Sequence, residues 1–258
     1  MRHRLRAVSY LNTVPLIWGM QHGPEHGSVD LSFSIPSDCA RDVENGVVEA
    51  GLVPVAEVAR QNLEIVPGTG IACHGAVRSI LLFSRVPWTQ IKTFAADASS
   101  RTSVELARII LRERFGVEPQ ITREQPRLAD MLSHADCALV IGDPALQIEP
   151  ERAGVEWMDL GAEWLRLTSL PFVFAVWAGK PGIPVESLSR ITMASYRFGS
   201  EHLDEIVESE HARHGISREL AQRYLTQHIH FEIGKEQQRG LDAFLELARL
   251  RPVLTLEP

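Results

Sequence analysis

The residues from Val8 to Leu16 constrain the fold of this chain more than any other stretch. A short apolar segment there breaks into a turn with the sequence Tyr-Leu-Asn-Thr-Val-Pro, which predicts a strand whose carboxyl end carries polar side chains. In open α/β sheets, ligands bind at the carboxyl ends of the strands. The polar residues and Pro15 also divide the apolar run into pieces too short to cross a bilayer or to form a signal-peptide core. We therefore expect the first strand to belong to a folded, cytoplasmic protein.

Length and charge limit the class of protein. A chain of 258 residues exceeds the usual compact domain, so we expect two domains of roughly 100 to 150 residues. With 26 Lys plus Arg against 33 Asp plus Glu, the net charge of -7 disfavours a phosphate backbone, and we expect neither a nucleic-acid nor a membrane partner. The cysteines Cys39, Cys73 and Cys137 form no C-x-x-C pair, so we expect core thiols in a reducing compartment.

Strand-like and helix-like segments alternate along the chain, as in a parallel sheet built from βαβ units. Two long apolar strands are predicted over residues 75–85 and 167–179, and they bracket a separate α/β series. Helices are predicted near residues 103–115, 126–133, 187–214, 218–227 and 235–250.

This order predicts an α/β protein with two domains. The first domain is discontinuous and comprises residues 1–88 plus 178–258. The second, inserted domain comprises residues 89–177. We expect a ligand cleft between the two domains.

The segment from Asp97 to Gly116 carries the clearest helix start. Thr102 followed three residues later by Glu105 predicts a capping box, and Gly116 is placed to end the helix. The free N–H groups of the first turn, with the neighbouring polar side chains, are suited to bind a carboxylate or a phosphate. These side chains are Ser99, Ser100, Arg101, Thr102 and Ser103. The alternative is a purely structural Ser/Thr cap beside a solvated arginine.

Other polar residues fall at or near the ends of predicted strands. Gly142 and Asp143 follow a strand and precede a proline, so Asp143 is a candidate N-cap, orienting acceptor or base. Ser37 follows the second predicted strand, while Arg78 and Ser79 lie within the first of the two long strands. We expect these residues to be candidates for the lining of the cleft.

Several patterns of known chemistry are incomplete or missing. Residues 68–70 imitate the beginning of G-x-G-x-x-G but lead into a strand rather than a helix, which disfavours a dinucleotide site. The pairs His211/His214 and His228/His230 lack H-E-x-x-H or a nearby cysteine, so we expect solvated surface histidines and no metal. The sequence contains neither the G-x-S-x-G nucleophile elbow nor the G-x-x-x-x-G-K-[ST] phosphate loop. It therefore lacks the motifs that usually indicate acyl transfer or nucleotide hydrolysis.

Taken together, the motifs resemble those of the chorismate dehydratases of the futalosine route to menaquinone. The shared blocks are Tyr10-Leu11-Asn12, Leu52-Val53-Pro54-Val55, Val77-Arg78-Ser79, Ser100-Arg101-Thr102-Ser103, Ile141-Gly142-Asp143, Leu170-Pro171-Phe172-Val173-Phe174-Ala175 and Gly240-Leu241. The resemblance spans nearly the whole chain, and the Ser-Arg-Thr-Ser and Leu-Pro-Phe-Val-Phe-Ala blocks are the most specific. Ser169 departs from the family pattern, which usually has glycine at this place.

The resemblance implies a two-domain type II periplasmic-binding-protein-like fold with a ligand cleft between the domains. It also implies that chorismate, which carries two carboxylates, loses water to give 3-[(1-carboxyvinyl)oxy]benzoate, without a cofactor or a metal. The implied substrate-binding residues are Tyr10, Ser37, Ser79, Ser100, Arg101, Thr102, Ser103 and Gly142. Asn12 and Asp143 are the candidate catalytic residues. Asn12 would orient the substrate or bind the departing hydroxyl, and the proton acceptor would be Asp143 or a carboxylate of the substrate itself.

Two other functions remain open at this point: a protein that captures a small anion for transport or sensing, and a lyase for another small carboxylate. Arg2, Arg4 and Arg6 imitate a basic signal start, but neither an Ala-x-Ala-like cleavage site nor an N-terminal cysteine follows. This pattern favours a cytoplasmic enzyme over an exported receptor. The fold does not separate these functions, and the sequence leaves the oligomeric state open.

Overall fold

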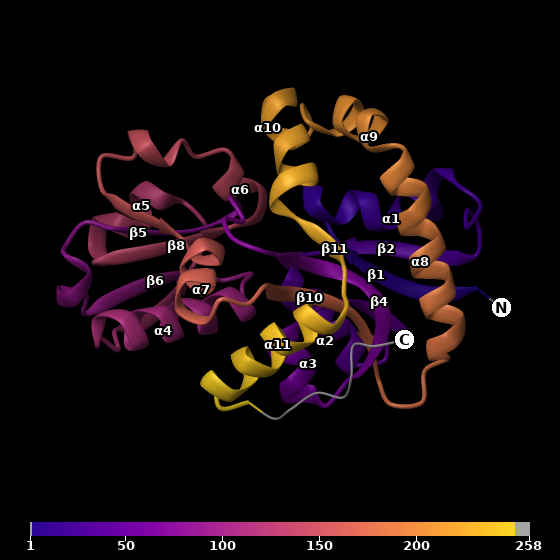
Figure 1. Ribbon diagram of the computed structural model, residues 1–258, viewed down its shortest axis with the longest axis horizontal. Helices are drawn as coiled ribbons and strands as arrows, with labels where there is room; N and C mark the ends of the chain where they lie inside the picture. Colours follow the sequence, from indigo (N-terminus) through magenta and orange to yellow (C-terminus); the bar gives the residue numbers. More distant parts are fainter. Residues whose placement is uncertain (1, 251–258) are drawn as a thin grey trace.

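The computed structural model describes residues 2–250, which form two β-sheets flanked by helices (Figure 1). The first sheet has the strand order β11-β4-β10-β3-β1-β2, and the second has the order β7-β6-β8-β5-β9. The strands are β1 His3–Val8, β2 Val29–Ser34, β3 Ala50–Pro54, β4 Glu64–Cys73, β5 Ile80–Ser84, β6 Thr93–Asp97, β7 Gln120–Glu124, β8 Cys137–Ile141, β9 Glu156–Asp159, β10 Phe172–Gly179 and β11 His230–Glu232.

Helices cover both faces of the first sheet. The α-helices are α1 Val14–His22, α2 Pro36–Glu44, α3 Val55–Gln61, α4 Thr102–Phe115, α5 Leu128–His134, α6 Gly142–Leu146, α7 Leu160–Thr168, α8 Val185–Glu201, α9 Leu203–Glu210, α10 Arg218–Arg223 and α11 Lys235–Leu247. Short 3-10 turns lie at η1 Leu11–Thr13, η2 Trp88–Gln90 and η3 Pro150–Arg152, and a π-helical turn, η4, spans Tyr224–His228. Helices α2, α3 and α11 pack on one face of the first sheet, and α1 and α8 pack on the other (Figure 1).

The two sheets form two lobes that lie side by side, the first lobe on the right in Figure 1 and the second on the left. In the first sheet, β1 runs parallel to β2 and β3, whereas β10 runs antiparallel to β3 and β4. In the second, β6 runs parallel to β7 and β8, and β5 lies antiparallel between β8 and β9. The carboxyl ends of β1 and β3 lead into η1 and α3, and those of β6 and β8 lead into α4 and α6.

The chain crosses between the lobes at other places than the sequence predicted. It leaves the first sheet after β4 and returns to it at β10, so the crossings fall within residues 74–79 and 169–171. The predicted limits at 88 and 178 therefore assign β5 and most of β10 to the wrong lobe. The reason is that the sequence of an apolar strand does not indicate which sheet it joins. Strands β5 and β10 are both buried on two faces, and only their pairing partners distinguish them.

Strand β4 is the largest element that the sequence analysis did not identify. Its sequence, EIVPGTGIAC, contains a proline and two glycines, which are typical of a turn. The structure accommodates them because the pairing with β10 shifts register, as at a β-bulge. Gly70 is needed because a Cβ at this position would lie 2.6 Å from the carbonyl oxygen of Ala175.

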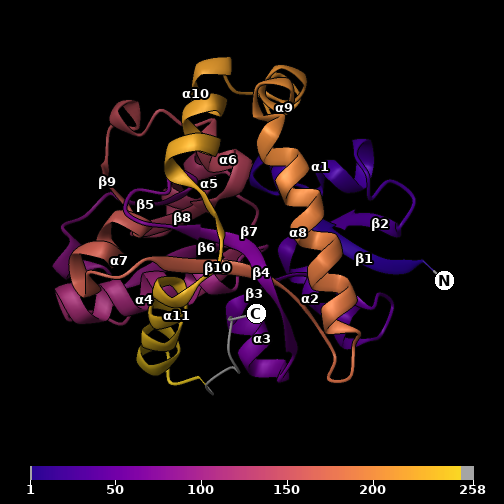
Figure 2. The same ribbon diagram turned by 45° about the vertical axis from the view of Figure 1, so that its right-hand side comes forward.

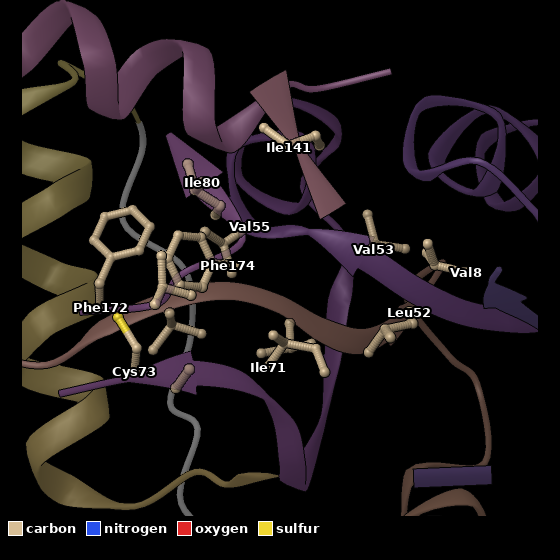
Figure 3. Packing of buried hydrophobic residues seen from close by; sticks show 14 of the residues in the cluster. Val8, Leu52, Val53, Val55, Ile71, Cys73, Ile80, Ile141, Phe172 and Phe174 are labelled. Atoms are coloured by element: carbon tan, nitrogen blue, oxygen red, sulfur yellow. The ribbon is translucent and has the colours of Figure 1, made fainter. Parts of the chain in front are cut away.

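The apolar core continues from the first lobe into the second beneath the junction. Figure 3 shows side chains of β1, β3, β4, β5, β8 and β10 converging there, among them Val8, Leu52, Ile71 and Phe174. Trp164 of α7 packs edge-on against Phe172 of β10, with ring centroids 5.1 Å apart. The three cysteines are buried and free, which confirms their prediction as core thiols.

Within residues 2–250, no helix combines the length and apolar character that a bilayer span requires. In the same part of the chain, no group of three or more His, Cys, Asp or Glu residues is arranged to hold a metal ion.

Candidate active site

A cleft lies between the two lobes, bounded by the turns that follow β1, β6 and β8. The space between its lining residues, which includes the part open to solvent, is about 590 Å³. The apolar part of the lining includes Val8, Leu52, Ile71, Ile80, Ile141 and Phe174, all labelled in Figure 3. The cleft therefore offers an apolar floor for a ring and a polar rim at the strand ends.

Most of the residues predicted for the site line this cleft. They are Tyr10, Asn12, Ser79, Ser100, Arg101, Thr102, Ser103 and Gly142. Ser37 and Asp143 are not among the lining residues, although Pro36, next to Ser37, is. The lining polar residues come from both lobes, so the site is complete only when the lobes are together.

The amino terminus of α4 forms one polar wall of the cleft. The first N–H groups of this helix have no partner within the helix, and they carry the positive end of its dipole. Ser100, 2% exposed, has a buried hydroxyl oxygen without a hydrogen-bond partner in the described part of the chain. Arg123 donates to the carbonyl oxygen of Ser100 at 2.9 Å and holds this turn in place. An anion with acceptor oxygens would satisfy the free donors.

The predicted capping box at the start of α4 is wrong. The N-cap residue is Arg101, which has no side-chain cap. The hydroxyl oxygen of Thr102 instead accepts a hydrogen bond from the backbone N–H of Ala56 in the first lobe, at 3.2 Å. Glu105 accepts from Arg60, also in the first lobe, at 2.7 Å. The tertiary contact between the lobes has replaced the local cap, while Gly116 ends the helix in the left-handed conformation, as predicted.

A second wall is held by a buried carboxylate. The hydroxyl of Ser99 donates to Asp97 at 2.7 Å, and the hydroxyl of Tyr10 lies 3.2 Å from that of Ser99 across the cleft. Asp97 is fully buried, and this burial raises the pKa of its carboxyl group. Burial also raises the pKa of Tyr10 to about 12. Because Ser99 donates its own proton to Asp97, the hydroxyl of Tyr10 donates to Ser99. This chain fixes the tyrosine ring at the edge of the cleft.

A hydrogen-bond chain joins Asn12 to Ser79 through a tyrosine that the sequence analysis did not identify. The amide nitrogen of Asn12 donates to the hydroxyl of Tyr224 at 3.0 Å, and that hydroxyl donates to the hydroxyl of Ser79 at 2.8 Å. Thr13, next to Asn12, also lines the cleft, and its buried hydroxyl has no partner in the described part of the chain. Ser79 and Thr13 are both 1% exposed, so their hydroxyls are available to a ligand in the cleft rather than to bulk solvent.

Asp143 lies behind the cleft lining and bridges the lobes. One carboxylate oxygen accepts from the backbone N–H of Leu11 at 3.1 Å, and the other lies 2.6 Å from the Nδ1 atom of His214. His214 is thus paired rather than solvated, which corrects the prediction of a surface histidine. Its hydrogen bond to Asp143 raises the pKa of His214. His214 lies in the segment between α9 and α10, and in Figures 1 and 2 helix α10 lies beside α6, which carries Asp143.

Gly142 is required by geometry at the point where β8 ends. Its φ of +64° lies in the left-handed region, and a Cβ there would lie 2.7 Å from the ring of Tyr10. Its N–H donates to the carbonyl oxygen of Ser79 at 2.8 Å. The residue therefore lets the two lobes approach and also fixes the backbone of Ser79.

Arg78 does not extend into the cleft but holds the crossing segment. Its guanidinium donates to the carbonyl oxygen of Ala145 in α6 at 3.0 Å and to that of Ile148, after α6, at 2.6 Å. Its own φ is +66°, an uncommon conformation for a residue with a side chain. Asp159 accepts from the backbone N–H groups of Val77 and Arg78 at 3.0 and 2.6 Å, so this segment is fixed on both sides.

The chemistry of the cleft follows from these side chains. The residues that line it carry hydroxyls, one amide, backbone donors and the guanidinium of Arg101, and none of them carries a carboxylate or an imidazole. Such a lining binds an anion through fixed donors, but it supplies no strong base of its own. Sequence analysis did not identify Tyr224, because it is 145 residues from Ser79 and 212 from Asn12 and no local pattern marks it. Thr13, which the sequence analysis also did not name as a site residue, could have been predicted because it lies in the same turn as Asn12.

Comparison with known proteins agrees with this architecture. A family described as menaquinone biosynthesis matches residues 3–250. A curated chorismate dehydratase of Thermus thermophilus is 31% identical over 255 residues, covering 92% of each chain. Among solved structures, protein AF1704 of Archaeoglobus fulgidus has a TM-score of 0.78 at 16% identity, covering 96% of this chain and 97% of that one. The alkanesulfonate-binding protein of Xanthomonas axonopodis pv. citri, bound to MOPS, has a TM-score of 0.68 at 12% identity, covering 98% and 96%. The chain thus has the two-lobed fold of periplasmic binding proteins.

Proposed function

This chain belongs to the menaquinone biosynthesis family, and we propose that it is a chorismate dehydratase, a carbon–oxygen lyase of the futalosine route. It converts chorismate to 3-[(1-carboxyvinyl)oxy]benzoate and water. The observation that carries the proposal is the cleft itself, in which an apolar floor lies between two sets of fixed donors. Chorismate has the matching shape, with a ring and two carboxylates.

Each part of the substrate has a suitable partner in the cleft. One carboxylate accepts from the first N–H groups of α4 and from the hydroxyl of Ser100, which lacks a protein partner within the described residues. The hydroxyls of Thr13 and Ser79 are placed to bind oxygens at the opposite wall. Asn12 orients the ring hydroxyl that departs.

The reaction breaks two bonds of the ring. The ring carbon that carries the enolpyruvyl ether loses its proton, and the electron pair of that C–H bond enters the ring. The hydroxyl group on the neighbouring carbon leaves with the electron pair of its C–O bond. The ring becomes aromatic, and the hydroxyl and the proton together make one water. Both carboxylate oxygens of Asp143 already accept protein donors outside the lining. We therefore assign the proton acceptor to a carboxylate of the substrate and give Asp143 a positioning role between the lobes. Aromatisation supplies the driving force.

The test is incubation of the purified protein with chorismate, without metal or nucleotide, followed by liquid chromatography with mass detection. We expect loss of one water and formation of the carboxyvinyloxy-benzoate. Replacing Asn12 with alanine is expected to lower kcat/KM by roughly 100-fold, comparable to removal of one preorganised polar group from an active site. Replacing Ser37 with alanine is the matched control, because Ser37 does not line the cleft and its loss should leave turnover unchanged.

Chorismate that stays unchanged would contradict the proposal. Calorimetric titration then separates the alternatives: binding without turnover indicates a small-anion binding protein, and absence of binding indicates a lyase for another acid.

A further inference from the structure

Tyr224 occupies a position where three distant segments meet. It lies on the π-helical turn after α10 and is 1% exposed. Its hydroxyl touches Asn12 from the turn after β1 and Ser79 from the crossing segment before β5. Single π-helical turns occur mostly inside α-helices and frequently at functional sites. Tyr224, from the C-terminal part of the chain, therefore connects two residues that line the cleft, Asn12 and Ser79.

The direction of the two hydrogen bonds matters more than their presence. The hydroxyl of Tyr224 accepts from the amide of Asn12 and donates its own proton to Ser79. Ser79 is thereby an acceptor toward Tyr224, so its own hydroxyl proton is left for another partner. Within residues 2–250, Ser79 has no acceptor for that proton, and it lines the cleft. The arrangement leaves Ser79 as a donor to a ligand.

The same hydroxyl also fixes the amide of Asn12. Because the amide nitrogen is committed to Tyr224, the carbonyl oxygen of Asn12 is left as the group available to a ligand. It forms no hydrogen bond to another residue in the described part of the chain. Burial raises the pKa of Tyr224, so its hydroxyl remains protonated and the direction of the chain is kept. One buried hydroxyl thus sets one donor and one acceptor in the cleft.

We propose that Tyr224 is a positioning residue for the dehydration: by accepting from Asn12 and donating to Ser79, it presents the Ser79 proton and the Asn12 carbonyl oxygen to chorismate. This inference rests on the proposed function. In it, Ser79 donates to a substrate oxygen while Asn12 accepts the hydrogen of the departing hydroxyl and so orients it. Tyr224 itself does not touch the substrate.

The test is Tyr224→Phe, which removes the hydroxyl and keeps the ring in its buried place. We expect kcat to fall about tenfold, as for loss of one neutral hydrogen bond that orients a reacting group, with a smaller change in KM. The matched control is Tyr196→Phe, since Tyr196 is half-buried on α8, packs against Phe231 and does not line the cleft. The control should keep the kcat of the wild type.

A double-mutant cycle separates positioning from a structural role. In the Ser79→Ala background, Tyr224→Phe should cause a smaller further loss of kcat than in the wild type, because only one of the two groups that Tyr224 aligns, Asn12, is still present. A Tyr224→Phe variant with a lowered melting temperature but unchanged kcat, or one with the same loss in both backgrounds, would overturn the inference. If the wild-type protein leaves chorismate unchanged, the proposed function fails and the inference fails with it. If the wild type turns over chorismate and Tyr224→Phe does so equally well, only the role of Tyr224 fails.

Discussion

The contact between α1 and α8 inside the first lobe differs from the contact between the two lobes. At the first, Gly19 lies against the backbone of Ser195, and Gly199 lies so near the carbonyl oxygen of Pro15 that a Cβ would overlap it. The contact between the lobes combines the apolar core that continues beneath the cleft with hydrogen bonds at its rim, such as the one from the backbone N–H of Leu11 to Asp143. The first contact is close-packed backbone, and the second has a polar rim.

This difference bears on how a substrate reaches the cleft. Hydrogen bonds between the lobes exchange for hydrogen bonds to water at a small net cost, roughly 0.5–1.5 kcal/mol each. Close backbone packing has no such substitute, because separation leaves the small residues without neighbours. We therefore expect the cleft to open at its polar rim, with the apolar core beneath it and the α1–α8 contact preserved.

The largest expected effect breaks the close-packed contact. Gly199→Ala places a methyl group against the carbonyl of Pro15 and forces α1 and α8 apart. Overpacking costs roughly 3 kcal/mol, and the better helix propensity of alanine returns about 1 kcal/mol. The melting temperature should fall by about 4–8 °C. Ser200→Ala, at the next and exposed position of α8, is the control and should change little. An unchanged melting temperature for Gly199→Ala would show that this contact is not close-packed.

The second prediction tests whether the contact between the lobes shapes the site. Gly142→Ala adds left-handed strain of roughly 1–2 kcal/mol and also displaces the ring of Tyr10. Gly154→Ala is a matched control, since Gly154 has a φ of +70° with no atom within 4 Å of the added Cβ. Both variants should lose roughly 2–6 °C in melting temperature, but only Gly142→Ala should lose turnover, by about tenfold or more. Equal turnover in the two variants would contradict the role of Gly142 in closing the cleft.

The smallest effect concerns the pH dependence of the contact between the lobes. The hydrogen bond to Asp143 raises the pKa of His214 above its unfolded value of about 6.5. Its charged pairing with Asp143 and Glu210 is therefore fully stabilising below about pH 6.5, and this stabilisation is lost as the pH rises through the raised folded value.

The measurement compares the melting temperatures of the wild type and His214→Gln at pH 6 and pH 9. The deficit of the variant should be larger at pH 6, by roughly 1–4 °C, if the pair contributes on the order of 1 kcal/mol. His74→Gln, at an exposed position, is the control. A deficit that is equal at both pH values would show that the charge of His214 does not hold the lobes together.

Sequence reasoning found most of the cleft lining because those residues lie at strand ends, where local pattern and fold class coincide. Tyr10, Asn12, Ser79, Gly142 and residues 100–103 all line the cleft. The roles of these residues, the cytoplasmic location and the futalosine route stay predictions. Ser37, in the first turn of α2, does not line the cleft.

Local sequence patterns predict the α/β class, the helix end at Gly116 and the polar turns, because these depend on hydrogen bonding and hydrophobic periodicity among near neighbours. The path of β4 through Pro67, the place of β5 in the second sheet and the hydrogen bond from Ala56 to Thr102 depend instead on contacts between distant segments. The same holds for Tyr224, whose two partners lie more than a hundred residues away. Such choices depend on which distant backbone offers the better partner, and the free energies that decide among partners arise only when the lobes pack.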